Sequence, residues 1–347
     1  MRSVTQFLRP VARRADLLRA GFTDRDIRRE LAARSIFRVR HGWYARVGTA
    51  DAVVRAVRVG GVLSGIEALR VRGVFLPPPA RVDIVVPHNA SGLRSPGSHR
   101  RRLSAGDGLR IHWIDGRRRR LPPSRWLASE DDALVLVLHI APRDTAVAAC
   151  DAVVRYLGWS PARLDAAFAR APRRVRAWRA LVDGRADSWG ETVLRLRLRD
   201  AGITMEPQAR VPGAGAFDGR VSAGVYLEVD GGQHAEDWDG EGGSRFERDH
   251  QKDLVLAQRG ARSIRLTYAQ LMGDWAGCLA AIRAAMALDD RARARRAPRR
   301  PARLRKLRTI TLETPARRAN RRPSSRTSSV FVGEGPQPAA RAPNVRR

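Results

Sequence analysis

The sequence predicts an α/β protein (α+β in its multi-domain organisation), because short runs with strand composition alternate with helical runs. Its 347 residues correspond to two or three domains at about 100–200 residues each. Hydrophobic residues make up 43% of the chain, which is enough to form buried cores. From residue 289 onward, Pro, Ser, Ala and Arg dominate and regularly spaced apolar residues are few. We therefore expect domains over residues 1–48, 49–184 and 185–288, and a disordered basic tail over 289–347.

The chain is strongly basic, with a formal net charge of +31 and a pI near 11.7. This balance indicates a polyanionic partner, most often nucleic acid; an anionic membrane surface or a genome rich in arginine codons are the alternatives. Almost all of the positive charge is arginine, because Lys252 and Lys306 are the only lysines. The tail alone can add affinity for phosphates that does not depend on base sequence.

The cysteine content and the apolar runs indicate a cytoplasmic protein. Cys150 and Cys278 are the only cysteines, so the chain has neither a CxxC metal motif nor a disulfide framework. Two isolated thiols fit a reducing compartment. The N-terminus has no apolar stretch of signal-peptide length, and the longest apolar run, residues 133–141, is too short to cross a bilayer.

The first 48 residues have the order of elements of a winged helix-turn-helix. Residues 15–20 have helical composition and stop at Gly21, and Thr23 is a suitable N-cap for a second helix over residues 24–34. Two short strands, Ile36–Arg40 and Trp43–Arg46, then flank a His-Gly turn. We expect a small helical unit that ends in a β-hairpin.

This segment resembles the N-terminal domain of the AbiEi-like antitoxins of type IV toxin–antitoxin systems. Residues 17–21, 27–31 and 38–44 carry the resemblance. It implies binding of double-stranded DNA by the second helix and the wing, where the basic side chains are Arg28, Arg29, Arg38 and Arg40. A small helical docking module is the structural alternative. A cognate toxin is expected as a partner only under the antitoxin interpretation.

The middle region, residues 49–184, carries no motif to which we assign chemistry. The patterns predict a helix that begins within residues 61–69, strands over 82–87 and 109–113, a loop over 89–108, helices over 133–140 and 145–157, and a basic helix over 171–187. The four arginines of residues 117–120 fit either a solvated loop or a phosphate contact.

An acidic segment stands out in this basic chain. Residues 226–253 contain nine Asp or Glu against three Arg or Lys. Residues 225–230 have strand composition, so Glu228 and Asp230 share one face of the strand. Neighbouring carboxylates on one face repel each other, which raises a pKa or recruits a cation, and a hard divalent ion fits oxygen ligands best. A hairpin through residues 222–224 would bring Asp218 close to Glu228.

The spacing of Asp218, Glu228 and Asp230 is close to the PD-(D/E)XK nuclease pattern. The wider string, from Ser188-x-x-Glu191 through Leu227–Gly231 and residues 248–267, resembles a bacterial domain family of uncharacterised function related to the very-short-patch-repair (Vsr-type) endonucleases. The resemblance covers about 100 residues. It implies a restriction-endonuclease-like fold, in which a mixed central sheet has helices on both sides.

The resemblance also implies roles for individual residues. Asp218, Glu228 and Asp230 would hold Mg²⁺ or Mn²⁺, with Asp230 alternatively orienting water, and Glu191 would be an outer carboxylate. His234 would act as general base, protonate the leaving group or bind metal. The structural alternative is a loop histidine that only forms hydrogen bonds. Lys252 is a candidate substitute for the lysine that Asp230 replaces in the motif. Arg248 and Arg265 would contact phosphate, although Arg248 could equally pair with nearby carboxylates.

Some of these residues have equally good structural explanations. Ser188 and Glu191 have the spacing of a capping box, which is compatible with a role in the site. Glu228 and Asp230 could be a solvated strand end. Residues 194–199 alternate with strand period, whereas the resemblance places them in a helix. After the acidic segment we expect a helix over 245–259, a strand over 263–267 and a final helix over 268–288 whose apolar residues form core.

These features fit two functions. The first is a metal-dependent DNA endonuclease targeted by an N-terminal DNA-binding domain. The alternative is a non-catalytic DNA-binding regulator of the antitoxin class with a degenerate nuclease fold. The carboxylates favour the enzyme, because without a metal they would repel a phosphate backbone. A third possible function is a Ca²⁺-binding module at Asp237, Asp239 and Glu241. A homodimer is compatible with the sequence.

Overall fold

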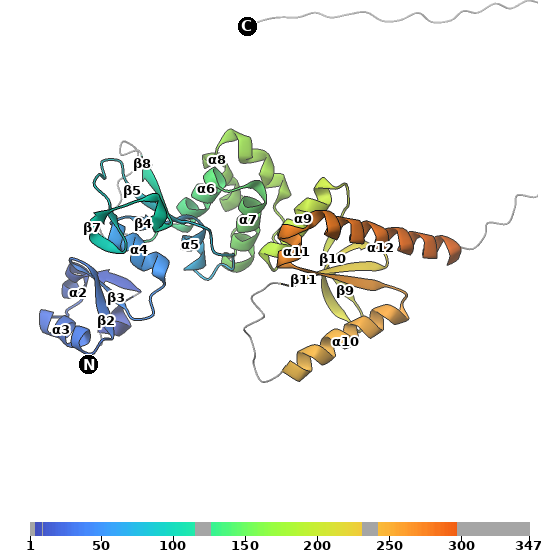
Figure 1. The fold of residues 1–347 in the computed structure, drawn as a ribbon, viewed down its shortest axis with the longest axis horizontal. Helices are drawn as coiled ribbons and strands as arrows, with labels where there is room; N and C mark the ends of the chain where they lie inside the picture. The colour runs from blue at the N-terminus through green and yellow to red at the C-terminus, as the bar shows by residue number, and fades with distance from the viewer. Residues whose placement is uncertain (1–3, 9, 115–125, 231–241, 297–347) are drawn as a thin grey trace, which may run out of the picture. The chain divides into compact units, whose positions relative to one another are not determined.

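The computed structural model describes residues 4–8, 10–114, 126–230 and 242–296 (Figure 1). For residues 242–249 it describes the backbone only. Residues 1–297 group into one compact unit. His234, the acidic residues 236–241, the arginines 117–120 and residues 297–347 lie outside the described part, so the expectations on them stay predictions. No helix in the described ranges has the length and apolar character needed to cross a membrane.

The N-terminal segment contains the predicted two helices and hairpin. After α1 (Val4–Phe7) and β1 (Val11–Arg13) come α2 (Arg14–Arg19), α3 (Asp24–Ala32), β2 (Ile36–Arg40) and β3 (Trp43–Arg46). The Thr23 side chain caps α3 in a capping box with Asp26, as its position predicted. The three strands form an antiparallel sheet in the order β1-β3-β2. Strand β1 was not predicted, because three residues are too few to show a period.

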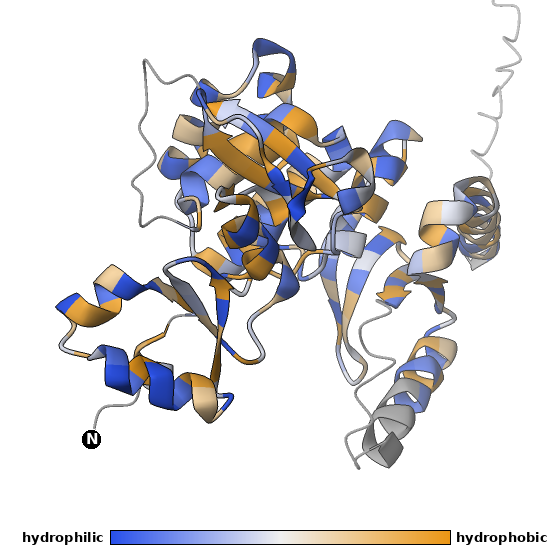
Figure 2. Cartoon of the chain, turned by 60° about the vertical axis from the view of Figure 1, so that its left-hand side comes forward, coloured by the Kyte–Doolittle hydropathy of each residue, from blue (hydrophilic) through white to orange (hydrophobic). Residues whose placement is uncertain are grey.

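A small core holds this segment together. It consists of buried apolar side chains from both helices and the sheet: Val4, Leu8, Leu17, Phe22, Ile27, Ile36 and Tyr44. Figure 2 shows the same division by colour, with hydrophobic positions alternating with hydrophilic ones along the helices and strands. The arrangement leaves the basic side chains of α3 and β2 on the outside.

The middle region is built from a three-stranded sheet and a group of helices. In chain order the elements are α4 (Asp51–Val59), β4 (Val62–Leu63), α5 (Gly65–Arg70), β5 (Val82–Pro87), β6 (Arg94–Ser95), β7 (Ser98–Arg102), the 3₁₀ helix η1 (Ala105–Asp107), β8 (Leu109–Ile114), α6 (Glu130–Ile140), α7 (Arg143–Leu157), α8 (Pro161–Arg170) and the 3₁₀ helix η2 (Arg173–Leu181). The sheet order is β4-β5-β8, with β4 antiparallel and β8 parallel to β5. The predictions of β5, β8, α6 and α7 are confirmed.

Three expectations about this region are wrong in part. Residues 61–69 hold a short strand before the helix, which begins only at Gly65. The predicted loop contains the hairpin β6–β7 and η1. The predicted basic helix over 171–187 is instead the shorter 3₁₀ helix η2, which begins directly after Pro172. Helices α4 and α8 were not predicted.

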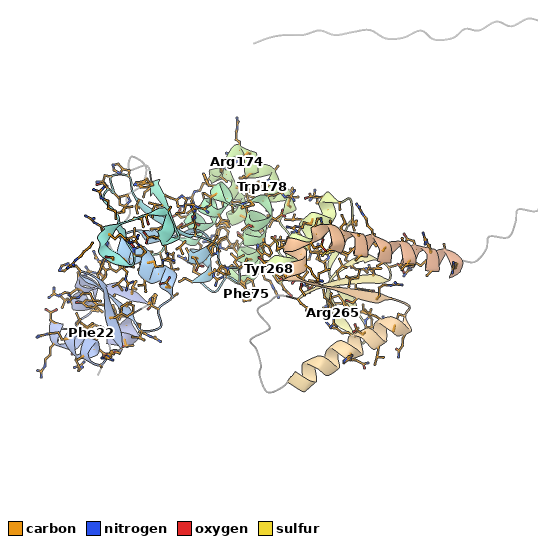
Figure 3. The ribbon with its side chains drawn as sticks, in the orientation of Figure 1. Phe22, Phe75, Arg174, Trp178, Arg265 and Tyr268 are labelled. Carbon is orange, nitrogen blue, oxygen red and sulfur yellow. The ribbon has the colours of Figure 1, made fainter. Side chains whose placement is uncertain are left out.

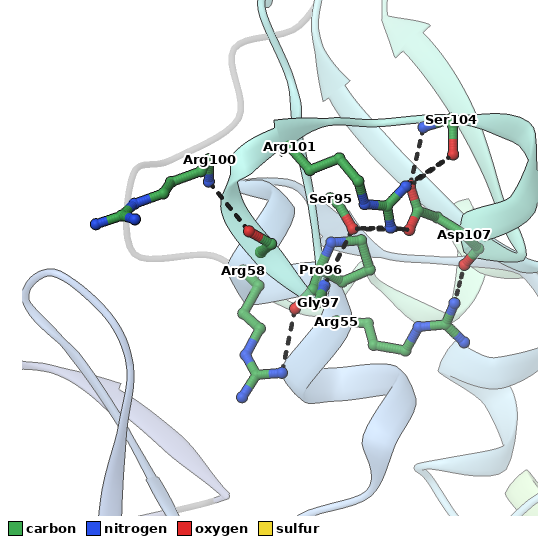
Figure 4. Close-up of polar contacts among 10 residues, drawn as sticks. Arg55, Arg58, Ser95, Pro96, Gly97, Arg100, Arg101, Ser104 and Asp107 are labelled. Atoms are coloured by element: carbon green, nitrogen blue, oxygen red, sulfur yellow. Dashed lines mark hydrogen bonds and ion pairs between the residues drawn. The ribbon is translucent and has the colours of Figure 1, made fainter.

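Polar contacts hold the β6–β7 hairpin (Figure 4). Because these contacts produce no regular apolar spacing, the sequence predicted a loop here. The Asp107 carboxylate accepts hydrogen bonds from Ser95 Oγ at 2.7 Å, from the Ser104 N–H at 2.8 Å and from Arg101. Arg55 of α4 donates to the Asp107 carbonyl. The hydrogen bond from Ser95, followed by that from Ser104, lowers the pKa of Asp107 to about 2.

The C-terminal part has the predicted mixed sheet with helices on both faces. Its elements are α9 (Trp189–Asp200), β9 (Glu206–Val211), β10 (Gly215–Ser222), β11 (Val225–Asp230), α10 (Gly242–Gln258), β12 (Arg262–Thr267), α11 (Tyr268–Gly273) and α12 (Trp275–Arg296). The sheet order is β12-β11-β10-β9, with β11 and β12 parallel and the other neighbours antiparallel. Helices α9 and α12 contact one side of the sheet (Figure 1). Val255 and Leu256 of α10 pack with Phe217 and Tyr226 in a separate core cluster.

Helix α9 forms despite the strand-like alternation of its sequence. Leu194, Leu196 and Leu198 are all buried, because α9 contacts α7 as well as β11 and α11. The arginines between these leucines are held at the sides of the helix. Arg195 forms an ion pair of 2.8 Å with Asp151 of α7, which also accepts from Thr192 Oγ1 at 2.8 Å.

The predicted final helix and the start of the tail both need correction. The helix is divided at Asp274 into α11 and α12, because Asp274 leaves helical geometry and its side chain accepts from the Gly277 N–H at 3.0 Å. Helix α12 continues to Arg296, so residues 289–296 are not part of a disordered tail. The prediction that this segment forms core is confirmed by the buried Leu271 and Ile282.

Asp289 is the residue that joins the extended end of α12 to the sheet. Its side chain is buried and accepts hydrogen bonds from the Gly224 N–H and from Ser222 Oγ, both at 3.0 Å. These groups form the turn between β10 and β11. A negative charge at this position therefore fixes the turn of the hairpin that carries Asp218 and Glu228.

We expect Asp289→Ala to lower the free energy of unfolding by about 1–3 kcal/mol, because the substitution leaves the buried Gly224 N–H without its acceptor. The measurement is urea unfolding followed by circular dichroism. Asp290→Ala is the matched control, because Asp290 is the exposed neighbour and its loss should change stability by less than about 0.5 kcal/mol. Equal effects of the two substitutions would show that the contacts of Asp289 do not hold the turn.

Candidate active site

Asp218 and Glu228 lie side by side on the β10–β11 hairpin, as the sequence predicted. Gly219 is opposite Leu227 in the antiparallel register, which makes the two acidic residues neighbours across the strands. The Val229 N–H donates to Asp218 Oδ2 at 2.6 Å. This bond fixes the Asp218 carboxylate beside the backbone of the strand that carries Glu228.

Asp218 is surrounded by groups that disfavour its charged form. Burial, and then the negative charges of Glu191 and Glu228, raise its pKa to about 7, while Val229 and Lys252 act in the opposite direction. A carboxyl group with such a pKa binds either a proton or a cation near neutral pH. The local charge balance at Asp218 therefore favours a positively charged ligand.

Glu228 has a basic side chain at each of its oxygens. Lys252 Nζ of α10 donates to Glu228 Oε1 at 2.7 Å, and Arg265 Nε of β12 donates to Oε2 at 3.1 Å. Arg265 is directly opposite Glu228 in the parallel register, and its side chain lies at the edge of the C-terminal sheet (Figure 3). The structure thus brings two of the three predicted basic residues, Lys252 and Arg265, to Glu228.

Lys252 is held in place by more than its ion pair. Its Nζ also donates to the Ala216 carbonyl at 3.2 Å and lies 5.1 Å from the centroid of the Phe217 ring. These contacts place an ammonium group between α10 and the start of β10. The Lys252 ammonium group therefore lies beside Glu228 with its position fixed from three directions.

Glu191 joins the site from the first turn of α9. Only 5% of its surface is exposed, and burial raises its pKa. Its N–H donates to Ser188 Oγ at 3.2 Å, whereas its own Oε2 accepts from the Asp187 N–H at 3.0 Å. The helix cap is present, but the carboxylate reaches one residue further back than a capping box would place it.

Gly190 allows α9 to approach the hairpin this closely. A Cβ atom at Gly190 would lie 2.8 Å from Val229 Cγ1, which is closer than real side chains pack. The absence of a side chain here lets Glu191 come near Asp218. A glycine before the carboxylate is therefore part of the geometry of the site.

Gln208 is a site residue that sequence reasoning missed. Its Nε2 donates to Glu191 Oε2 at 2.8 Å. Its backbone has φ of +53°, although it lies in strand β9 and is not glycine. Non-glycine residues with positive φ are strained and gather at functional sites. No periodicity or motif marked this position, because the strain shows only in the folded backbone.

The remaining predicted residues are not brought into this group. Asp230 is exposed at the end of β11, opposite Thr267. His234 lies outside the described residues. Arg248 lies on α10, and its side chain is not described. Within the described ranges, no three His, Cys, Asp or Glu side chains are arranged to hold a metal ion.

The four predicted DNA-binding arginines of the N-terminal segment are all exposed. Arg28 and Arg29 lie on α3, where Arg29 pairs with Asp26 at 3.1 Å. On the hairpin, the guanidinium groups of Arg38 and Arg40 lie over the rings of Tyr44 and Trp43, 5.9 and 5.5 Å from the centroids. Cation–π contacts of this kind hold the basic groups at the surface of the hairpin.

We expect Asp218→Asn to stabilise the metal-free protein at alkaline pH. The pKa of Asp218 in the folded chain, about 7, is above its ordinary value of 3.8, so the folded state binds this proton more tightly than the unfolded state. Wild-type stability should therefore fall as the pH rises from about 4 to above 7. In urea unfolding with EDTA, we compare the free energy of unfolding of the variant with that of wild type. The difference should shift by about 2 kcal/mol in favour of the variant as the pH rises from 5 to 8.

Glu206→Gln is the control for this measurement, because Glu206 is an exposed carboxylate of the same sheet. It should show no comparable gain. An Asp218→Asn variant whose pH dependence equals that of wild type would mean that Asp218 is not held in an unfavourable charged state.

No protein-family model matches this chain, and no curated protein sequence matches it. The resemblances to Vsr-type nucleases and to AbiEi-like antitoxins therefore rest on the quoted residues alone. What this site can do follows from its own geometry: two adjacent carboxylates, a lysine and an arginine on one of them, and a buried glutamate behind.

Proposed function

We propose that the protein is a metal-dependent DNA endonuclease that hydrolyses phosphodiester bonds. The observation that carries the proposal is the pairing of Asp218 with Glu228 at a position where Lys252 lies 2.7 Å from Glu228. Carboxylates alone would repel a phosphodiester, and basic residues alone would only bind it. Both together at one sheet edge fit hydrolysis of a phosphate ester assisted by a divalent ion.

The residues present fit a hard cation, because Asp218 has unfavourable surroundings for its charge and carboxylate oxygens are the preferred ligands of Mg²⁺. Asp218 and Glu228 would hold Mg²⁺ or Mn²⁺, whereas Asp230 is exposed at the end of β11 and lies outside this group. The ion would lower the pKa of a bound water and offset charge on the phosphate. Lys252 and Arg265 would donate hydrogen bonds to phosphate oxygens. Glu191, which accepts a hydrogen bond from Gln208, would place a negative charge beside Asp218.

The N-terminal segment would supply the targeting. Its order of elements, two helices followed by a hairpin, supports a winged helix-turn-helix that reads double-stranded DNA. Arg28 and Arg29 on α3, with Arg38 and Arg40 on the hairpin, would contact phosphates. This assignment places recognition and cleavage on different parts of one chain.

A second candidate function is a DNA-binding regulator of the antitoxin class without catalysis. The observation that favours it is that both Glu228 oxygens are already engaged by Lys252 and Arg265. In such a protein the ion pairs would be structural and would replace the metal. The two functions differ in whether these carboxylates are needed for cleavage.

We expect the full chain to cut DNA in the presence of Mg²⁺ or Mn²⁺, and Glu228→Gln to reduce the rate by at least about 100-fold, because a metal ligand is lost. The assay uses supercoiled, single-stranded and mismatched DNA, with EDTA as the metal-free control. Glu206→Gln should cut at the wild-type rate. Binding without cleavage by wild type on every substrate, or equal rates for both variants, would favour the regulator.

DNA binding by the N-terminal arginines can be tested through its salt dependence. Replacing Arg28 and Arg29 by alanine should reduce the slope of log K against log salt by about 1 for each phosphate contact removed. Binding is measured by fluorescence anisotropy on labelled duplex DNA, with Arg19→Ala as control, because Arg19 is exposed on α2. An unchanged slope for the double variant would exclude α3 from the DNA interface.

A further inference from the structure

The β6–β7 hairpin of the middle region carries an excess of positive charge that the proposed nuclease site does not use. Residues 94–107 contain four arginines and a single acidic residue, Asp107. Asp107 is buried, and its carboxylate is already engaged by Ser95, Ser104 and Arg101. Its negative charge therefore holds the hairpin together and leaves the other arginines of the segment without a local counter-ion.

Three arginines hold this hairpin against the rest of the middle region. Arg55 of α4 donates to the carbonyl of Asp107, and Arg58 of α4 donates to the carbonyl of Pro96 at 3.1 Å. Arg101 pairs with the Asp107 carboxylate (Figure 4). A surface that is ordered in this way before a partner arrives loses less conformational entropy on binding.

The other three arginines of the hairpin point away from these contacts. Arg94, Arg100 and Arg102 are exposed, and their side chains form no hydrogen bond or ion pair with any part of the chain that the structure describes. Figure 4 shows the Arg100 side chain directed away from Asp107. Arg102 follows Arg101 on β7, and successive side chains of a strand point to opposite faces. All three guanidinium groups are thus available to an external partner.

Two of these arginines lie directly across from each other. Arg94 of β6 and Arg102 of β7 are partners in the antiparallel register, which shifts immediately after this pair. Like charges at directly opposite positions destabilise a pair of strands. An anion between the two guanidinium groups removes this repulsion, and a phosphate suits them best because it accepts two parallel hydrogen bonds from each planar group.

The composition of the hairpin indicates which phosphates it fits. Residues 93–107 contain no Phe, Tyr or Trp, and the leucines at 93 and 103 pack against the main core. Protein partners and membrane surfaces are bound through apolar or aromatic anchors, and single strands through stacking on aromatic rings. The phosphate backbone of duplex DNA requires basic side chains alone.

The hairpin is also continuous with the N-terminal wing. Arg58, which bonds to the hairpin, lies in the last turn of α4, and Gly60 follows that helix directly. The guanidinium group of Arg40 lies against Gly60, because a Cβ atom there would be 2.5 Å from Arg40 Nη1. The C-terminal end of α4 therefore connects the β6–β7 hairpin to a strand whose arginines we assign to DNA binding.

We propose that the β6–β7 hairpin is a second DNA-binding element, in which Arg94, Arg100 and Arg102 bind the phosphate backbone of a duplex without reading its base sequence. The proposal rests on the proposed function in taking DNA as the partner. It gives the middle region, for which the sequence indicated no chemistry, the role of extending the DNA interface beyond the wing.

The test uses the full chain and fluorescence anisotropy on labelled duplex DNA, with EDTA present so that no DNA is cut. In the triple variant Arg94→Gln, Arg100→Gln, Arg102→Gln, the slope of log K against log salt should fall by about 2–3, because about 0.9 is lost for each phosphate contact. At about 0.1 M salt the affinity should fall at least about tenfold, and by the same factor on duplexes of unrelated sequence. The corresponding triple lysine variant keeps the charges and should keep the slope.

A second triple variant is the matched control. Arg173→Gln, Arg176→Gln, Arg199→Gln removes the same charge from exposed positions of η2 and α9, and its slope should change by less than about 1. The Tm of the hairpin variant should be at least that of wild type, because the repulsion between Arg94 and Arg102 is removed. A loss of binding with this Tm is not a loss of folding.

Three results would overturn the proposal. They are an unchanged slope in the hairpin glutamine variant, equal losses in that variant and the control, and a loss of affinity that is confined to one DNA sequence. If the slope is unchanged but vesicles of phosphatidylserine and phosphatidylcholine bind wild type and not the variant, the hairpin binds a membrane surface instead.

Plasmid cleavage with Mg²⁺ separates this proposal from the proposed function. A chain that shows the expected change of slope but cuts no DNA contradicts the endonuclease alone. A chain that cuts DNA while the hairpin glutamine variant keeps the wild-type slope contradicts only the contact made by the hairpin.

Discussion

The hydrogen bond from the Val229 N–H to Asp218 is the contact on which the candidate site depends. It fixes the register of the β10–β11 hairpin at the point where two carboxylates become neighbours. The other members of the site are placed relative to this hairpin: Arg265 by its parallel register with Glu228, and Glu191 by the close approach of α9 that Gly190 allows. A shift of one residue in the register would turn Asp218 to the other face of the sheet.

The site contains unfavourable interactions, which contacts with neighbouring residues offset. Burial and two nearby carboxylates disfavour the charged form of Asp218. Gln208, which donates a hydrogen bond to Glu191, has a strained backbone. Lys252 and Arg265 neutralise Glu228 in the same small volume. Such conflicts cost stability and persist where a ligand or substrate relieves them.

Much of the fold could be predicted from the sequence, because its elements have clear boundaries. Thr23 as an N-cap, the strands Ile36–Arg40 and Val225–Asp230, and Gly260 after α10 are local signals that tertiary contacts left unchanged. The alternation in residues 194–199 by itself indicates a strand, but the helix that the resemblance implied is confirmed; the alternation arises because α9 is buried on two sides. The loop prediction for residues 89–108 failed because polar contacts of Asp107, rather than apolar spacing, hold that hairpin.

For the site, spacing along the chain predicted the pair of carboxylates, whereas Lys252 was expected only from the resemblance. Asp218 and Glu228 lie on consecutive strands, so their proximity follows from the hairpin alone. Gln208 could not be predicted, because its role comes from a backbone conformation and from a contact with a helix that precedes it in the chain. The partners of Glu228 likewise depend on how α10 and β12 pack, which spacing does not encode.

The ion pair between Asp151 of α7 and Arg195 of α9 has a consequence for how this chain could have evolved. Arg195 is only 12% exposed and its partner lies on the other side of the predicted boundary near residue 184. A recombination event that exchanged the C-terminal part alone would bring a buried guanidinium into a host without its carboxylate, which is strongly unfavourable. An exchange that begins before α7 would keep this ion pair together with the sheet that carries the carboxylates.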